Sequence, residues 1–211
     1  MRSQSGESRF LVSLSLFAGL LIVSVAGWML YSSLQDQGRE EFPAMTSSAV
    51  IESPAGHAYQ YVAAANIAWE TARTEASKRV FKGRPGYLAT LDDRAEFDFV
   101  MQKVFPEDTD VTYLGGRQTA PGEWRWVTGP EAKAHGGRGT LFWRGDEQGA
   151  VEGGHYANWM SSAFQHGGKW DVAKVCCVTI FSYSVPQFST SLGNGDPDEH
   201  VAGYIVEFGG E

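Results

Sequence analysis

Residues 10–31 form an uncharged apolar run, FLVSLSLFAGLLIVSVAGWMLY, which constrains the chain more than any other feature. About 20 such residues are enough for one transmembrane helix. Arg2 and Arg9 precede the run, and the nearest charges after it are net negative. Because positive residues favour the cytoplasmic side, we expect residues 1–9 to be a cytoplasmic tail and the rest of the chain to lie outside the cytoplasm.

A cleaved signal peptide is the competing interpretation of this run. The run is longer than the apolar core of a signal peptide, about 7–15 residues, and SVAGW at residues 24–28 is a poor cleavage site. We therefore expect an uncleaved signal-anchor, with the domain on the periplasmic or extracellular side of the cytoplasmic membrane. Residues 32–56 are polar and lack hydrophobic periodicity, as expected for a linker.

Residues 57–211 carry the pattern of one α+β domain. Two helices are expected near its start, with Asn66 and Asp92 as candidate N-caps and apolar faces that include Trp69 and Phe97. From Gly122 on, short strands alternate with glycine-rich loops, which favours a mainly antiparallel sheet. The clearest strand patterns are HAYQYVAA (57–64), GYLATL (86–91), VTYLGG (111–116) and AGYIVEF (202–208).

The stretch GEWRWVTGPE, residues 122–131, places two tryptophans one residue apart. Successive side chains of a strand point to opposite faces, so Trp124 and Trp126 share one face and Arg125 points away. An indole is too large an apolar group to leave exposed without cost, so we expect the tryptophan face to be buried.

Several motifs together resemble the C-type lectin-like domain, particularly its bacterial form. They are YLATLDDRAEFDFV (87–100), YLGG (113–116), GEWRWVTGPE, LFWRG (141–145), YANW (156–159) and GYIVEF (203–208). The resemblance covers residues 57–209 and implies a C-type lectin-like fold, with two helices, mainly antiparallel strands and a long loop region. In that family the paired tryptophans are core beneath the loops. We expect the structural core to include Trp69, Leu114, Trp124, Trp126 and Trp159.

The family's calcium-dependent sugar site is not reproduced in this sequence. Such members carry Glu-Pro-Asn or Gln-Pro-Asp in the long loop and Trp-Asn-Asp before the last strand, because calcium takes about six to eight oxygen ligands. Here Asn194 and Asp196 could replace two members of the triplet, and Asp171, Asp198 and Glu199 lie at unfamiliar spacing. We therefore expect no cofactor and no bound metal, calcium being the one candidate.

Enzyme signatures are missing from the sequence. The five histidines match no zinc spacing, and there is no nucleophile elbow, P-loop or dinucleotide fingerprint. The two cysteines, Cys176 and Cys177, are adjacent, so a bridge between them needs a shorter Cα–Cα distance than disulfides prefer. We interpret them as two small strand residues, in preference to a redox or metal role, and expect a protein that is not an enzyme.

The remaining hypotheses concern binding. A net charge of −8 without a dense basic patch argues against nucleic acid as a partner. Apolar residues in the Ser- and Pro-rich part of residues 173–195, among them Phe188, either mark a protein contact or fold back into the core. The leading hypothesis is a protein-binding module or accessory subunit of a membrane complex, and the alternative is a carbohydrate-binding lectin. The candidate binding residues are Trp170, Asp171, Tyr183, Phe188, Asn194 and Asp196.

Overall fold

A computed structural model describes residues 45–106, 109, 111–146, 148–164, 176–181 and 186–209. The chain divides into two compact units, Met1–Glu41 and Phe42–Glu211, and all described residues belong to the second. The expected cytoplasmic tail, the expected transmembrane helix and most of the expected linker precede the described part. Among residues 45–209, as far as they are described, no helix has the length and apolar character needed to cross a bilayer.

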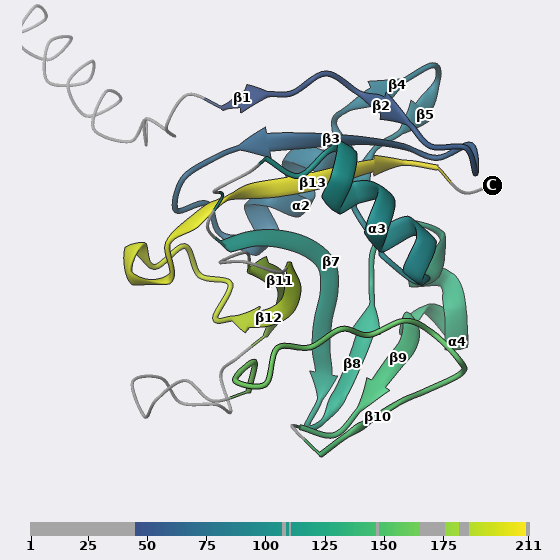
Figure 1. The fold of residues 1–211 in the computed structure, drawn as a ribbon, viewed down its shortest axis with the longest axis vertical. Coiled ribbons are helices and arrows are strands. Elements are labelled where there is room, and N and C mark those ends of the chain that lie inside the picture. Colours follow the sequence, from purple (N-terminus) through teal and green to yellow (C-terminus); the bar gives the residue numbers. More distant parts are fainter. Residues whose placement is uncertain are drawn as a thin grey trace, which may run out of the picture. The chain divides into compact units, whose positions relative to one another are not determined.

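The described unit is a mixed α+β domain with few helices and a large sheet, which confirms the predicted class (Figure 1). Its helical elements are α2 (Trp69–Ser77), α3 (Arg94–Lys103), η1 (Pro130–Lys133), α4 (Ala134–Gly137) and η3 (Pro197–Glu199). Its strands are β1 (Thr46–Ser47), β2 (Ile51–Glu52), β3 (Ala58–Ala63), β4 (Val80–Phe81), β5 (Arg84–Pro85), β6 (Tyr87–Leu88), β7 (Val111–Ala120), β8 (Glu123–Trp126), β9 (Thr140–Arg144), β10 (Ala150–Val151), β11 (Cys177–Phe181), β12 (Gln187–Ser191) and β13 (Val201–Phe208).

The main sheet has the strand order β1-β3-β13-β7-β8-β9-β10. The first long strand, β3, pairs antiparallel with the last strand, β13, so the two ends of the domain are joined in the sheet. β13 pairs parallel with β7, and the other pairings between the described strands are antiparallel. An isolated parallel bridge joins Trp159 to Phe188 of β12. β7 also pairs with β8 and with β11, and β11 forms a hairpin with β12, so β7 connects the terminal strands to the second half of the domain.

The terminal part of the sheet is buried on both faces, because a helix covers each. Along β13, Tyr204 and Val206 pack with α2, while Ile205 between them packs with α3. Trp69 of α2 also donates its Nε1–H to the carbonyl of Leu114, 2.8 Å away. The apolar run AGYIVEF is thus continuous because neither of its faces meets water, as is usual for a strand covered on both sides.

Local capping differs from the sequence prediction at both helices. Asp93, not Asp92, caps α3 and accepts a hydrogen bond from the Glu96 backbone N–H at 2.8 Å. The N-cap of α2 is Ala68, and Asn66 instead adopts a left-handed conformation with φ of 56°. Asparagine tolerates that conformation better than most residues, because its short side chain can hydrogen-bond locally.

The paired tryptophans of β8 are both buried, and so is the arginine between them. Trp126 stacks on Phe142 with 4.5 Å between ring centroids. Gly116 on β7 leaves room for this ring, since a Cβ there would lie 2.9 Å from Trp126. Arg125 points away from the tryptophan face as predicted, yet it is only 4% exposed because it donates to the Gly139 carbonyl and pairs with Glu123.

The expected linker, residues 32–56, extends past the point where the chain joins the sheet. β1 and β2 both pair with β3, so residues 46–52 belong to the domain. The strand predicted at residues 111–116 likewise continues through its two glycines to Ala120.

Two predictions about the segment after residue 173 are wrong. Cys176 and Cys177 form a disulfide and are not two separate thiols. Residues 187–191, expected within a loop, form strand β12 of the hairpin with β11. The alternative of burial is confirmed for Phe188, which is fully buried, and Leu192 is partly buried.

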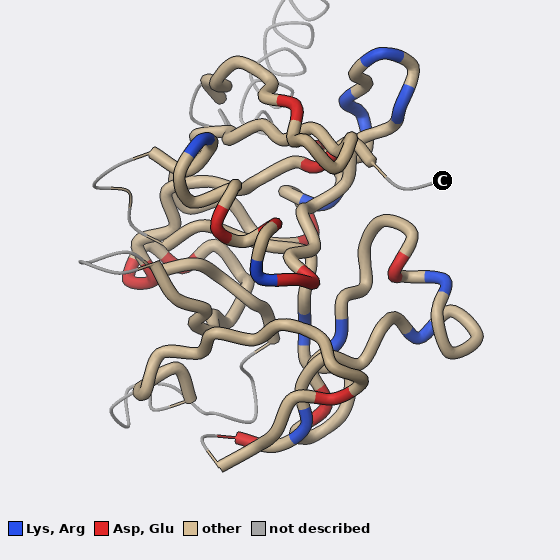
Figure 2. Tube along the Cα trace, turned by 45° about the vertical axis from the view of Figure 1, so that its right-hand side comes forward, with Lys and Arg blue, Asp and Glu red and all other residues tan. Residues whose placement is uncertain are grey.

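Charged residues are distributed unevenly over the domain (Figure 2). β4 and β5 form a separate two-stranded hairpin, with the basic residues Lys82 and Arg84 in it and Lys78 and Arg79 directly before it. Between Glu75 and Asp92 the sequence contains no acidic residue. The hairpin is therefore a local basic surface on a chain whose net charge is −8.

Candidate functional site

The structure describes three of the six binding residues predicted from the sequence, Phe188, Asn194 and Asp196. Trp170, Asp171 and Tyr183 fall in parts of the chain that the structure does not describe. Phe188 is fully buried on β12, so it offers no face on which a sugar ring could stack. Its ring instead meets Phe97 edge-on, with 5.5 Å between centroids.

Asn194 and Asp196 lie close together before η3, where their side chains shape the backbone. Asn194 Oδ1 accepts from the Asp196 N–H at 3.0 Å, and Asp196 Oδ1 accepts from the Asp198 N–H at 2.9 Å. Glu199 is 4% exposed and accepts from the Ser191 hydroxyl at 3.1 Å and from the Leu192 N–H. These oxygens accept hydrogen bonds in two turns and in a buried contact.

An aromatic cluster fills the part of the domain below these loops. Trp124, Trp126 and Phe188 are fully buried in it, while Trp159, which was predicted as core, is partly exposed at its edge. Trp159 meets Trp124 at 5.3 Å and Phe188 at 5.7 Å between centroids. Rings from β8, β9, β12, α3 and the segment 156–164 therefore hold these elements together.

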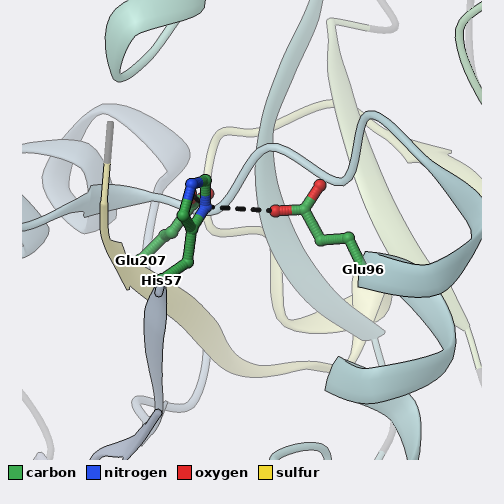
Figure 3. A group of neighbouring side chains, drawn as sticks. All are labelled: His57, Glu96 and Glu207. Atoms are coloured by element: carbon green, nitrogen blue, oxygen red, sulfur yellow. Dashed lines mark hydrogen bonds and ion pairs between the residues drawn. The ribbon is translucent and has the colours of Figure 1, made fainter. Parts of the chain in front are cut away.

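A second group of polar side chains lies beside α3, and the sequence analysis did not identify it. His57, Glu96 and Glu207 come from the residue before β3, the first turn of α3 and the end of β13, and they face one another (Figure 3). His57 Nδ1 lies 2.8 Å from Glu207 Oε1 and 3.7 Å from Glu96 Oε1. These residues line a pocket of about 480 Å³ that also includes Tyr59 and Glu131.

Hydrogen bonds from the protein satisfy the two glutamates of this group. Glu207, 1% exposed, accepts from His57, from the Tyr87 hydroxyl at 2.7 Å and from the Thr90 backbone N–H at 3.0 Å. Glu96 accepts from the Tyr59 hydroxyl and from the Asp92 backbone N–H, the latter at 2.8 Å. Buried carboxylates are tolerated when they have such donors.

Burial and mutual repulsion set the electrostatics of the pocket. Removal from water and the charge of Glu207 raise the pKa of Glu96 to about 7. The hydrogen bond to Glu207 is the main cause that raises the pKa of His57. Burial also raises the pKa of Glu131. The pocket therefore holds protons more tightly than exposed groups of the same kinds would.

The three facing side chains could hold a metal ion, since one ligand atom from each lies within 4.8 Å of the others. One imidazole nitrogen with two carboxylate oxygens suits zinc or a similar transition metal better than calcium, which prefers an all-oxygen shell. A metal bound through His57 Nδ1 would have to replace the hydrogen bond from that atom to Glu207.

Sequence signals for this group existed but were weak. Glu207 is a charged residue in a strand whose other positions are apolar, and such a residue needs a buried partner. Asp93 and Glu96 have the spacing of an N-terminal capping box, which offers a local explanation for Glu96. Nothing local links either residue to His57, which lies 150 positions before Glu207.

The chain resembles known proteins in sequence and in fold. No family model matches the chain. Halomucin from Haloquadratum walsbyi is 36% identical over 118 residues, which cover 56% of this chain and 1% of halomucin. The crystal structure of the C-type lectin CEL-I from Cucumaria echinata matches with a TM-score of 0.47 and 15% identity, over 83% of this chain and 99% of the lectin chain.

Proposed function

We propose that this chain is a non-catalytic binding module with a C-type lectin-like fold. Residues 10–31 hold it at the outer face of the cytoplasmic membrane, and it recognises a protein partner, as a free receptor or as an accessory subunit of a membrane complex. The binding surface is the loop surface, defined here as residues 153–164 and 192–200.

The observation that carries the proposal is the aromatic cluster beneath the first of these loops, residues 153–164. Trp159 and Phe164 of the first loop pack on the fully buried Trp124 of β8. The Phe188 carbonyl of β12 accepts from the Met160 N–H at 3.0 Å, so the same loop is tied to the hairpin. Loops fixed on a rigid scaffold are where proteins commonly place recognition surfaces.

Two features favour a position outside the cytoplasm. The uncharged run of residues 10–31 is long enough for a membrane span. The disulfide between Cys176 and Cys177 suits an oxidising compartment, because cytosolic reductants keep most protein thiols reduced.

The pocket beside α3 supports a structural role more than a catalytic one. The Thr90 and Asp92 backbone N–H groups, which could have stabilised a developing negative charge, already donate to Glu207 and Glu96. Glu207 has donors on both of its oxygens and almost no exposed surface. We therefore assign the His57, Glu96 and Glu207 group to joining α3 to the terminal strands, without a cofactor.

Site-specific photocrosslinking in native membranes tests the function. A photoreactive amino acid replaces Ser162 or His200, both exposed on the loop surface, in the full chain expressed in its own host. The matched control carries the same group at Thr74, which is exposed on α2. We expect one discrete crosslinked protein from the loop positions and none from Thr74.

Crosslinks of equal yield from all three positions would indicate nonspecific collision. Recovery of the uncrosslinked chain alone, from membranes that hold it at native abundance, would refute a stable protein partner.

Carbohydrate binding is the second candidate, favoured by the motifs that resemble C-type lectins and by the exposed side chain of Asn194. A glycan array probed with the full chain in detergent, with and without chelator, distinguishes carbohydrate binding from protein binding. Saturable glycan binding would replace the protein-partner proposal, and its loss in chelator would establish a calcium site that the sequence did not predict.

A further inference from the structure

The β4–β5 hairpin stands apart from the main sheet and combines basic and apolar exposure. It forms its own two-stranded sheet, and Lys82 and Gly83 at its turn have positive φ angles of 50° and 78°. Val80 is 67% exposed, more than any other large apolar residue in the described part of the chain. A single exposed valine is common on protein surfaces, so the feature that distinguishes the hairpin is the combination of Val80 with the basic residues around it.

The basic residues of the hairpin exceed the acidic groups that contact them. Lys82 pairs with Glu52 at 2.6 Å, and Lys78 pairs with Glu75 at 2.6 Å. Arg79 instead contacts neutral groups, Gln60 Oε1 at 2.9 Å and Ser47 Oγ at 3.4 Å. The four basic side chains near Val80 thus have two carboxylates as ion-pair partners, Glu52 and Glu75. This leaves a surplus of two positive charges around Val80.

The hairpin also lies beside the segment through which the chain enters the domain. Arg79 contacts Ser47 of β1, Lys82 contacts Glu52 of β2, and Arg84 donates to the Gly56 carbonyl. Figure 1 shows β1, β2, β4 and β5 together at the top, whereas β9, β10 and β12 lie in its lower half. Residues 32–44 separate Met45 from the expected membrane span and reach at most about 45 Å when extended.

We propose that the β4–β5 hairpin docks on the anionic lipid surface of the membrane that anchors the chain. Lys78, Arg79, Lys82 and Arg84 contact lipid phosphates while Val80 enters the boundary between headgroups and acyl chains. Cations flanking an apolar side chain suit this interface, since each Lys or Arg contributes about 1 kcal/mol near an anionic surface. The inference rests on the proposed function, because it takes residues 10–31 as the anchor.

Docking through this hairpin would set the orientation of the domain. The rest of the acidic chain is repelled by an anionic surface, so the basic hairpin is the part that faces the lipid. The part of the domain that holds β9, β10 and β12, in the lower half of Figure 1, would then lie farther from the membrane than the hairpin. Residues 158–164 of the loop surface contact β12 and would be open to a partner there.

The test measures the polarity around the hairpin in lipid nanodiscs. The full chain with Val80→Cys carries an environment-sensitive fluorophore, attached without reductant so that the native disulfide stays closed. It is reconstituted in neutral phosphatidylcholine discs and in discs with about a third of phosphatidylglycerol. We expect blue-shifted, brighter emission only in the anionic discs, reversed by about 0.5 M NaCl because salt screens the attraction. The same label on Ser162→Cys should respond to neither lipid nor salt.

Two charge-matched double variants identify the residues responsible. Lys78→Gln with Lys82→Gln removes two exposed hairpin lysines, and Lys103→Gln with Lys133→Gln removes two exposed lysines elsewhere. In the Lys78→Gln, Lys82→Gln variant we expect the ratio of docked to undocked hairpin to fall by up to about 25-fold, about fivefold for each lysine. In the control variant the ratio should stay within about twofold of that of the unchanged chain. Equal emission in both kinds of disc, or equal losses in both variants, would overturn the inference.

Failure of the anchor is detected separately in the same experiment. If the chain does not co-elute with discs, the proposed span is wrong, and the labelled full chain is then added to preformed vesicles of the two compositions. Salt-sensitive blue-shifted emission on anionic vesicles would still support docking. Emission independent of composition would refute it and leave an acidic protein or polysaccharide as the partner of the hairpin.

Discussion

Replacing Phe188 tests whether this residue is part of the core or part of a ligand surface. Its side chain is fully buried and its ring centroid lies 5.5–6.5 Å from those of Phe97, Trp126, Phe142, Tyr156 and Trp159. Truncation of a buried Phe to Ala costs about 3–5 kcal/mol, since it removes apolar burial and leaves a cavity. We expect Phe188→Ala to fall in the upper part of that range, because the rings around it are held by several separate elements.

Equilibrium unfolding in urea measures this loss. Trp126 and Trp159 lie next to Phe188, so tryptophan fluorescence reports the transition in detergent-solubilised full chain. A loss of 3–5 kcal/mol corresponds to a decrease in Tm of about 6–20 °C for a domain of this size. Phe188→Leu keeps most of the volume and should recover much of the stability. Val80→Ala, at an exposed position, should change it by less than about 0.5 kcal/mol.

A small effect would refute the packing argument. If Phe188→Ala costs less than about 1 kcal/mol, the ring is not surrounded as described, and its earlier assignment to a sugar-binding surface regains force. Loss of ligand binding with unchanged stability would support that assignment directly.

Three further predictions concern the pocket, the loop and the disulfide. Because the pKa of Glu96 is raised from 4.5 to about 7, the folded state binds more protons than the unfolded state. The stability that this group contributes is therefore fully present below about pH 4.5 and is lost as pH rises through about 7, and the raised pKa of His57 acts in the same direction above its ordinary value of 6.5. Urea titrations should show a free energy of unfolding lower at pH 8 than at pH 5 by on the order of 3 kcal/mol, and Glu96→Gln should reduce this difference. A free energy of unfolding that rises with pH would contradict the raised pKa of Glu96. Gly193→Ala should destabilise by about 1–3 kcal/mol more than Gly136→Ala, because the two glycines have similar φ angles of 71° and 72° but only a Cβ at Gly193 would meet the two sulfurs of the disulfide. Equal losses would show that the loop carrying Gly193 can move aside. Intact-mass measurement after alkylation without reductant should find no labelled cysteine, and after reduction two, whereas labelling of the unreduced chain would refute the Cys176–Cys177 bond.

The α+β class and the order of its main elements could be predicted because they depend on local patterns. The alternation of Trp124 and Trp126 identified a buried strand face, and the run AGYIVEF identified the final strand. The position of α3 could also be predicted, although its cap is Asp93 and not Asp92. Helical and strand periods are properties of neighbouring residues, so the sequence reports them directly.

The candidate site could not be predicted, because its residues are far apart in the sequence. The pairing of β13 with β3 and the packing of α3 bring them together. Glu207 faces His57 since the last strand pairs with the first long strand, and Glu96 joins them because α3 lies on that face of the sheet. Phe188 was assigned to a loop since its Ser- and Pro-rich surroundings suggested one, yet pairing with β11 makes it core.

By itself, the amino-acid sequence determined the α+β class, the buried face of the tryptophan pair and the excess of negative charge, all of which follow from composition and short-range periodicity. Only the tertiary structure decided that His57, Glu96 and Glu207 share a pocket, that Arg125 is buried and that the basic residues near Val80 stand on a separate hairpin. The physical reason is that a side chain's burial and its charge partners depend on which distant segments pack against it, and a single sequence carries no direct record of those contacts.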